Sequence, residues 1–475
     1  MTTCCTGNAR NGGYDLAVIG AGSAGFSAAI TAAEQGARVA LIGHGLIGGT
    51  CVNVGCVPSK TLIRAAESLH HAEAAARFAG IRGEARLDDW RSLVAQKDEL
   101  VAGLRQAKYA DLLPSYNTIA YFEATARLSP QGVHANGEIL SVGKTIVATG
   151  ASAARPLIPG VEDVDSLTST RALDLQVLPR SMLVIGGGYI GCELAQLFAR
   201  AGVRVTLACR SRLLPEGEPE VSEALAGYLS EEGIDVRTGL VYRRMRRTNG
   251  GIALDAGLNG AEEALEADVV LAATGRSPNT AGLGLSDVDV VLTESGGIRV
   301  DEHLRTTNRQ VYAAGDVTGR HQFVYMAAYG AKLAALNALN GATHRYDATA
   351  MPMVTFTDPQ VASVGLTEAA ARAAGYEVKT SVLPLDAVPR ALAARDTRGL
   401  IKLVADRASD RLLGAHILAP EGADSIQTAA LAISHGMTTK GLGETIFPYL
   451  TTVEGLKLAA QTFDKDVTKL SCCAG

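Results

Sequence analysis

Short apolar runs that end in glycine turns fill the first two thirds of the chain. Residues 14–19 (YDLAVI) are followed by the turn GAGSAG, by an alanine-rich segment that reaches about Gln35, and by a second apolar run at 38–42. A short apolar run bounded by turns indicates a buried strand, and the longer segment indicates a helix. The pattern predicts a strand–turn–helix–strand unit whose turn carries Gly20, Gly22 and Gly25.

The same unit recurs near the middle of the chain. The apolar run 181–186 (SMLVIG) leads into GGGYIG, a predicted helix that reaches about Arg200, and the run VRVTLA. Glycines at this spacing let the backbone approach a pyrophosphate, whose charge the helix N-terminus stabilises. We therefore expect two bound nucleotides or one large internal duplication. The glycines of the second turn are Gly186, Gly188 and Gly191.

Later apolar runs set the predicted domain boundaries. Further strands are predicted at 145–150 (TIVATG), 269–275 (VVLAATG) and 311–316 (VYAAGD). We place a first nucleotide-binding domain over 1–152 and 283–350, and a second one inserted over 153–282.

From about Met351 the pattern changes to alternating apolar and polar positions, which predicts antiparallel strands. A hairpin is expected with strands around 399–405 and 411–418, followed by a helix near 422–436. The predicted fold is α/β, with two Rossmann-like nucleotide-binding domains and a C-terminal α+β domain over 351–475 that serves in assembly.

Composition argues against several classes of function. The 475 residues are 47% hydrophobic and 20% charged, as in a globular chain with large cores. A net charge of −5 without a long basic block argues against nucleic acid and anionic membrane partners. No run approaches the ~18–20 apolar residues of a membrane span, and MTTCCTGNARNGG lacks the apolar core of a secretory signal. We expect a cytoplasmic protein, whose close cysteine pairs are catalytic or metal-binding.

One cysteine pair lies just after the second predicted strand. Cys51 and Cys56 have four residues between them in GGTCVNVGCVPSK, and Pro58 is expected to open the next helix. A helix N-terminus favours an anion, so the pKa of Cys56 should be lowered and its thiolate should exchange with disulfides or bind soft metals. The alternatives are two buried thiols or half of a zinc site, for which the sequence offers no second pair of ligands.

These motifs together carry a family resemblance. GGTCVNVGCVPSK, preceded by GAGSAG and followed by GGGYIGCELAQ, ATGRSPN and YAAGD, resembles the FAD-dependent pyridine nucleotide–disulfide oxidoreductases over essentially the whole chain. The resemblance implies FAD on the first unit, a nicotinamide nucleotide on the second, and a homodimer that forms through the C-terminal domain. It also implies that Cys56 lies against the flavin while Cys51 exchanges with the substrate.

The resemblance assigns further site residues. Lys60 and Glu193 look like an ion pair near the flavin, Tyr189 like the ring that covers the nicotinamide pocket, and Asp316 like a ligand of the FAD ribityl chain. The remaining positions that the motifs assign to cofactor binding are Gly49, Thr50, Thr149, Gly150 and Gly275. One position departs from the pattern: Gly43, followed by His44, stands where an acid normally binds the adenosine ribose. A water or His44 could take that contact, but FAD affinity could be weaker than the family norm.

The residues after the strand VRVTLA indicate which nicotinamide nucleotide binds. An NAD-preferring site would show Asp or Glu about twenty residues past Gly186, where this chain has Cys209, Arg210, Ser211 and Arg212. Arginine recognises a 2′-phosphate through charge and paired N–H bonds. We expect NADPH; the alternative is a solvated basic loop.

The substrate is indicated by a missing imidazole and a second pair of thiols. Members that act on organic disulfides carry an acid–base His before a Pro near the C-terminus, whereas here Phe447 precedes Pro448 and Tyr449. Cys472 and Cys473 lie at the C-terminal end, where a tail can collect a soft ion. The alternative is a terminus whose thiols do nothing.

This combination most resembles the mercury-reducing branch of the family, whose activity gives mercury resistance. The resemblance implies that Hg(II), delivered as a dithiolate complex, passes from Cys472 and Cys473 of one subunit to Cys51 and Cys56 of the other. It also implies that Tyr109 and the partner's Tyr449 line the metal site, although from sequence either could be an ordinary half-buried tyrosine.

Two remaining pieces of the sequence leave alternatives open. Cys4 and Cys5 could serve in metal capture or lie in an inert tail. The competing functions are a thioredoxin reductase-like or dihydrolipoamide dehydrogenase-like disulfide reductase, and a thiol carrier of metals without turnover.

Overall fold

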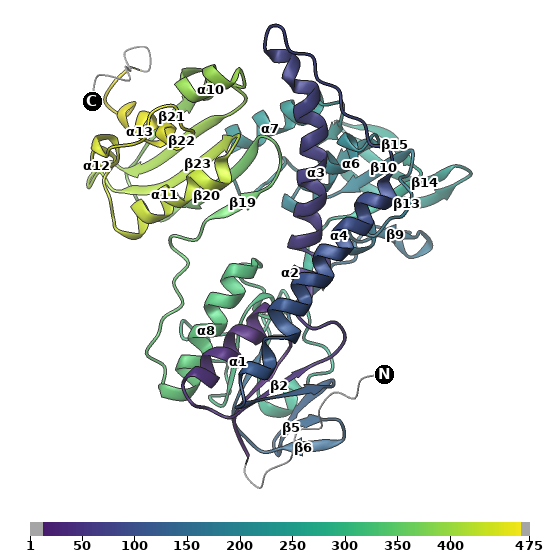
Figure 1. Ribbon diagram of the computed structural model, residues 1–475, viewed down its shortest axis with the longest axis vertical. Helices are drawn as coiled ribbons and strands as arrows, with labels where there is room; N and C mark the ends of the chain where they lie inside the picture. Colours follow the sequence, from purple (N-terminus) through teal and green to yellow (C-terminus); the bar gives the residue numbers. More distant parts are fainter. Residues whose placement is uncertain (1–12, 467–475) are drawn as a thin grey trace. The chain divides into compact units, whose positions relative to one another are not determined.

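The computed structural model describes residues 13–466 of the chain (Figure 1). The predictions made for Cys4, Cys5, Cys472 and Cys473 therefore lie outside the described residues. The chain divides into two compact units that are discontinuous in sequence. Within the described residues, the first unit comprises 13–59, 92–154 and 275–347, and the second comprises 60–91, 155–274 and 348–466.

The first unit is built on a five-stranded parallel sheet with the order β18-β7-β1-β2-β3. Its first three elements, β1 (Tyr14–Ile19), α1 (Ser23–Glu34) and β2 (Val39–Gly43), match the predicted strand–turn–helix–strand unit. The other strands of this sheet are β3 (Ile119–Glu123), β7 (Val142–Val147) and β18 (Val311–Ala313). The carboxyl ends of the parallel strands therefore meet at the edge of the sheet from which α1 begins.

Two helices cover one face of this sheet. Alanines of α1 and of α8 (Val324–Asn340) pack with Leu16, Val18 and Leu41 in one buried cluster. Small residues allow the two helices to approach each other closely, and Figure 1 shows α1 and α8 side by side. A second cluster, which includes Ala17, Ile19 and Ile42, lies on the opposite face. Beyond it the unit adds a small antiparallel sheet of β4 (Ala126–Ser129), β5 (Gly132–Ala135) and β6 (Glu138–Leu140).

Three helices carry the two cysteines and the chain that follows them. They are α2 (Gly49–Val54), α3 (Cys56–Ala74) and α4 (Trp90–Arg105), with a π-helical turn at Gln106–Ala110. The pair β8 (Ala151–Ala153) and β17 (Arg276–Pro278) forms a two-stranded antiparallel ribbon in the first unit.

The second unit contains the repeated nucleotide-binding pattern. Its parallel sheet has the order β12-β11-β10-β16-β9, and the helix that follows the second glycine turn is α6 (Tyr189–Arg200). The sheet strands are β9 (Ser166–Leu167), β10 (Ser181–Ile185), β11 (Arg204–Ala208), β12 (Asp235–Arg237) and β16 (Val269–Ala272). The flanking elements are α5 (Ser169–Leu173), α7 (Pro219–Glu231) and the antiparallel strands β13 (Val241–Thr248), β14 (Gly251–Leu258) and β15 (Ala261–Ala267).

The C-terminal part of the second unit is an antiparallel sheet with helices, as predicted. The hairpin strands are β22 (Leu400–Asp406) and β23 (Leu412–Ala419), and the following helix is α11 (Gly422–Ser434). The other strands are β19 (Met353–Thr355), β20 (Gln360–Gly365) and β21 (Val378–Pro384). The other helices are α9 (Glu368–Ala373), α10 (Pro389–Ala394), α12 (Thr439–Glu444) and α13 (Glu454–Gln461).

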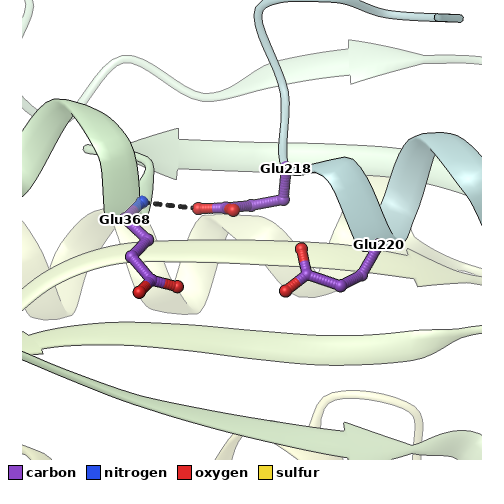
Figure 2. A group of neighbouring side chains, drawn as sticks. All are labelled: Glu218, Glu220 and Glu368. Carbon is purple, nitrogen blue, oxygen red and sulfur yellow. Dashed lines mark hydrogen bonds between the residues drawn. The ribbon is translucent and has the colours of Figure 1, made fainter.

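A buried lysine joins the two parts of the second unit. Lys402 of β22 is 2% exposed, and its Nζ lies 2.9 Å from Glu218, 2.8 Å from Glu220 and 3.0 Å from Glu368. Figure 2 shows these three carboxylates converging from the start of α7 and from α9. Burial would lower the pKa of Lys402, but its hydrogen bonds to the three glutamates raise it above the ordinary value. The ammonium group therefore stays charged and occupies the centre of the acidic cluster.

Candidate functional site

The first glycine turn forms a cradle for a pyrophosphate at the start of α1. A Cβ on Gly25 would lie 1.7 Å from the Gly20 carbonyl oxygen, so only glycine allows the helix to pack this close to the turn. Gly22 is the N-cap of α1 and offers no side chain to the first N–H groups of the helix. Gly22 and Gly48 form an isolated parallel β-bridge, and Gly48 N donates a hydrogen bond to Ala21 O at 2.8 Å. The open N–H groups beside side-chain-free backbone fit the diphosphate of a dinucleotide.

The second turn repeats this geometry at the start of α6. A Cβ on Gly191 would lie 1.8 Å from the Gly186 carbonyl oxygen, and Gly188 is an N-cap without a side chain. Tyr189, the first residue of α6, is half-buried. The same backbone solution thus occurs in both units, and the residues present fit a second dinucleotide.

The cysteine pair lies in two consecutive helices rather than before one. Cys51 is in α2, a six-residue helix that the sequence pattern did not predict, and Cys56 is the first residue of α3. The expectation that Pro58 opens this helix was wrong by two residues, because the backbone becomes helical directly after Gly55. Cys56 therefore sits at the N-terminus itself, where the helix dipole favours a thiolate.

Two residues that sequence reasoning missed hold the helix of Cys51 in place. The Asn53 side chain donates to the carbonyls of Ile47 at 2.9 Å and Gly49 at 2.8 Å. Arg105, the last residue of α4, in turn donates to Asn53 Oδ1 at 3.0 Å. Asn53 lies between the two cysteines in sequence, which was the only available signal.

Lys60 and Glu193 form the predicted ion pair. Lys60 Nζ lies 2.7 Å from Glu193 Oε2, and the Glu193 side chain is 4% exposed. The other oxygen of Glu193 accepts a hydrogen bond from Phe356 N at 2.9 Å, and Lys60 Nζ lies 4.9 Å from the centre of the Phe356 ring. Lys60 follows Cys56 by one helical turn in α3. The buried carboxylate is thus fully partnered.

Asp316, which the family resemblance predicts to bind the ribityl chain of FAD, lies at the end of a strand of the first sheet. It begins a short 3₁₀ turn after β18, and its carboxylate lies 3.6 Å from the Arg276 guanidinium. Burial raises the pKa of Asp316 above its ordinary value, although Arg276 opposes this shift. A partly buried carboxyl group at the carboxyl end of a parallel strand suits a hydroxyl-rich ligand.

Thr149 and Gly150, predicted to bind the cofactor, contact the ATGRSPN segment. Thr149 Oγ1 donates to Asn279 O at 2.7 Å, and Asn279 N donates to Gly150 O at 2.9 Å. The carbonyl of Gly275, the glycine of that segment, accepts from Ala154 N at 2.9 Å. These bonds fix two loops of the first unit to each other. Thr50 lies in α2 and is exposed, and Gly49 begins that helix.

The two arginines predicted to recognise NADPH have different environments. Arg212 donates to the carbonyls of Pro215 at 2.8 Å and Gly217 at 2.7 Å, so its guanidinium closes the loop after β11. Arg210 is exposed and forms no hydrogen bond or ion pair with a described residue. Arg210 is therefore the one of the two that is available to a 2′-phosphate. The preceding Cys209 is buried, and its thiol donates to Ser211 O at 3.0 Å.

The predicted substrate-side residues are distributed over both units. In the first, the Tyr109 ring meets Phe26 of α1 edge-on at 4.8 Å, and a Cβ on Gly48 would lie 3.0 Å from that ring. Tyr109 thus packs against the first nucleotide cradle. In the second, Phe447 is half-buried against the C-terminal core, whereas the Tyr449 side chain is 54% exposed. The structure gives no imidazole at Phe447 for acid–base chemistry.

Comparisons with known proteins agree with this geometry. A family model described as "Pyridine nucleotide-disulphide oxidoreductase" matches residues 14–331, and one described as its "dimerisation domain" matches residues 351–460. The predicted fold class, including the C-terminal assembly domain, is confirmed. No described helix is long and apolar enough to cross a bilayer.

Curated relatives align with nearly the whole chain. A mercuric reductase of Streptomyces lividans is 49% identical over 468 residues, covering 98% of this chain and 99% of that protein. A mercuric reductase of Staphylococcus aureus is 47% identical over 467 residues, covering 98% of this chain and 85% of that protein. Among solved structures, the Cu(II) complex of the HOCl-induced flavoprotein disulfide reductase RclA from Escherichia coli matches with a TM-score of 0.83 and 29% identity, covering 96% of this chain and 100% of that chain.

Proposed function

Because this chain belongs to the pyridine nucleotide-disulphide oxidoreductase family, we propose that it reduces Hg(II) to Hg(0) with electrons from NADPH. The observation that carries the proposal is the near full-length identity with mercuric reductases, joined to a cysteine pair that follows the first nucleotide cradle. FAD binds at the first cradle and NADPH at the second.

The cofactors supply the electrons, and the chain supplies the ligands. The glycine turns capped by Gly22 and Gly188 would hold FAD and NADPH, which when bound would supply a hydride donor and a two-electron carrier. Reduction of a Cys51–Cys56 disulfide takes up two electrons and two protons and leaves two thiols. Their thiolates are soft ligands that suit Hg(II) better than water or carboxylate does.

Thiolate exchange then brings the metal to the reduced pair. Hg(II) leaves its external thiolates for Cys51 and Cys56, one Hg–S bond breaking as another forms. Two further electrons convert the bound ion to Hg(0), and both thiolates are released. These reaction steps consume no proton at the metal, so they do not require the imidazole that Phe447 replaces.

The C-terminal domain is a dimerisation domain, and the chain is expected to act as a homodimer. We propose that the active site is shared, with Cys472 and Cys473 of one subunit passing Hg(II) from dithiolate complexes to Cys51 and Cys56 of the other. Tyr109 and the partner subunit's Tyr449 would line that path. The exposure of Tyr449 leaves its ring accessible, and a reducing compartment such as the cytoplasm would keep the tail thiols ready to exchange.

One assay tests the function directly. NADPH oxidation is followed with Hg(II) in the presence of excess small thiol, while volatile mercury is collected. We expect mercury-dependent NADPH oxidation with one Hg(0) released for each NADPH consumed, because both steps transfer two electrons. Hg(II) that only inhibits, with thioredoxin or lipoamide stimulating turnover, would show a disulfide reductase instead.

A further inference from the structure

The first nucleotide cradle lacks an acid at the end of its second strand. Dinucleotide-binding units of this kind place an Asp or Glu there, and its carboxylate accepts hydrogen bonds from the adenosine ribose. In this chain β2 ends at the buried Gly43. A Cβ on Gly43 would lie 2.5 Å from the Cβ of Ala21, which belongs to the glycine turn. The usual position therefore has no room for a side chain unless the turn moves.

The neighbouring strand ends in an acid at the same level of the sheet. Gly43 pairs in parallel register with Glu123, the last residue of β3. Ala124 N donates to Gly43 O at 2.7 Å, which fixes this register at the strand ends. Neighbouring strands lie about 4.8 Å apart, a shift that the two methylene groups of a glutamate can span.

Alternation of side chains puts Glu123 on the correct face. Leu41 belongs to the core cluster beneath α1 and α8 and Ile42 to the opposite cluster, so position 43 faces α1. In the same way Tyr121 packs against the α1 cluster and Phe122 against the other, so Glu123 also faces α1. That is the side on which the cradle offers its helix N-terminus.

The Glu123 carboxylate is available. Glu123 is exposed, and no hydrogen bond or ion pair links its carboxylate to a described residue. Burial, together with the charge of Glu123, raises the pKa of the half-buried Tyr121, which is consistent with a carboxylate near the Tyr121 hydroxyl on the α1 side. An ionised carboxylate accepts only, and two neighbouring ribose hydroxyls are donors that match its two oxygens.

We propose that Glu123 binds the ribose hydroxyls of the FAD adenosine, replacing from the adjacent strand the acid that Gly43 cannot carry. The inference rests on the proposed function, because it takes the first cradle to hold FAD. It makes Glu123 a cofactor-binding residue that no motif of the sequence marks.

The test is equilibrium binding to the apoprotein, measured by the change in flavin fluorescence. FAD and an analogue with 2′-deoxyadenosine are titrated into the native protein and into Glu123→Gln. Loss of a hydrogen bond to a charged acceptor should weaken FAD binding by Glu123→Gln about tenfold or more. The deoxy analogue should bind the native protein about as weakly as FAD binds Glu123→Gln. Its affinity for Glu123→Gln should be nearly the same as its affinity for the native protein. Glu99→Gln, which removes an exposed charge in α4, is the matched control.

Two results would overturn the inference. In the first, Glu123→Gln binds FAD as tightly as the native protein does. In the second, the substitution weakens binding of the deoxy analogue as much as it weakens binding of FAD. If His44→Ala weakens FAD binding and Glu123→Gln does not, the ribose contact belongs to the exposed imidazole of His44 instead. Native protein that takes up no FAD would contradict the proposed function itself, whereas tight native binding with an unaffected variant contradicts this inference alone.

Discussion

Lys60 Nζ lies 2.7 Å from Glu193 Oε2, and this bond ties α3, the helix that Cys56 begins, to α6, the helix that follows the second glycine turn. The Glu193 side chain is 4% exposed and the Lys60 side chain 32% exposed, so the carboxylate depends on this lysine and on Phe356 N for its partners. Removing the cation leaves the buried carboxylate desolvated without compensation, which lowers the free energy of unfolding. Replacing both partners by hydrophobic residues leaves no such buried charge.

Lys60→Met should therefore destabilise the protein more than the double replacement Lys60→Met with Glu193→Leu. We expect the single variant to lose about 3 kcal/mol and its thermal midpoint to fall by several degrees. The double variant should recover part of that loss. Thermal unfolding of the FAD-loaded proteins measures both, and a double variant less stable than the single one would contradict the interpretation.

Arg210→Ala should lower kcat/KM for NADPH about tenfold or more while kcat/KM for NADH changes little, because only NADPH carries the 2′-phosphate. Arg212→Ala is the informative comparison, since Arg212 holds the loop through the carbonyls of Pro215 and Gly217. It should lower kcat/KM for both nucleotides. Equal losses for NADPH and NADH in Arg210→Ala would remove the assignment of Arg210.

Acid should destabilise the second unit through two buried carboxylates. Burial opposes the ionisation of Asp358 and Asp396, but Arg200 and Arg398 beside Asp358, and Arg398 beside Asp396, hold both pKa values below the ordinary 3.8. A lowered folded-state pKa contributes stability above the unfolded value and loses it as pH falls towards the folded value. The thermal midpoint should therefore fall steeply below about pH 4. Asp396→Asn should lower the midpoint at pH 7 and make its acid dependence shallower; an unchanged slope would exclude Asp396 as a source.

Replacing both tail cysteines, Cys472→Ala with Cys473→Ala, should separate priming from metal delivery. NADPH should still reduce the Cys51–Cys56 disulfide, because the tail takes no part in that step. Turnover of Hg(II) bound to bulky thiols should fall, since those ligands cannot reach the inner pair directly. Rapid-mixing absorbance and steady-state NADPH oxidation measure the two steps, and full turnover with bulky thiols would show that the tail has no role in delivery.

Much of this fold was predictable because its signals are local. The glycine turns at Gly20 and Gly186, each between an apolar run and an alanine-rich or amphipathic segment, predicted β1, α1, β10 and α6 to within a residue or two. The short α2 was missed because six residues between Gly48 and Gly55 are too few to show a helical period.

Parts of the site that depend on the path of the backbone or on distant residues could not be predicted. The environment of Arg212 depends on carbonyls within its own loop, and carbonyl direction leaves no mark in the sequence. The availability of Glu123 depends on the register of β3 beside β2, and the two strands are separated along the chain by the three helices α2, α3 and α4 and their connections. Glu193 was found only through its place in a known motif, since its partner Lys60 lies 133 residues away.

Lys402 and its three glutamate partners connect two segments of the second unit, so that these segments should not fold well as separate fragments. A fragment that ends before β19 would keep Glu218 and Glu220 without their cation, and the complementary fragment would bury an ammonium group with only Glu368 beside it. Neither fragment therefore keeps the complete charge cluster, so we expect the segment that carries the second glycine turn and the C-terminal segment to unfold together. Genes that exchange these segments between relatives would have to exchange both sides of this charge cluster together.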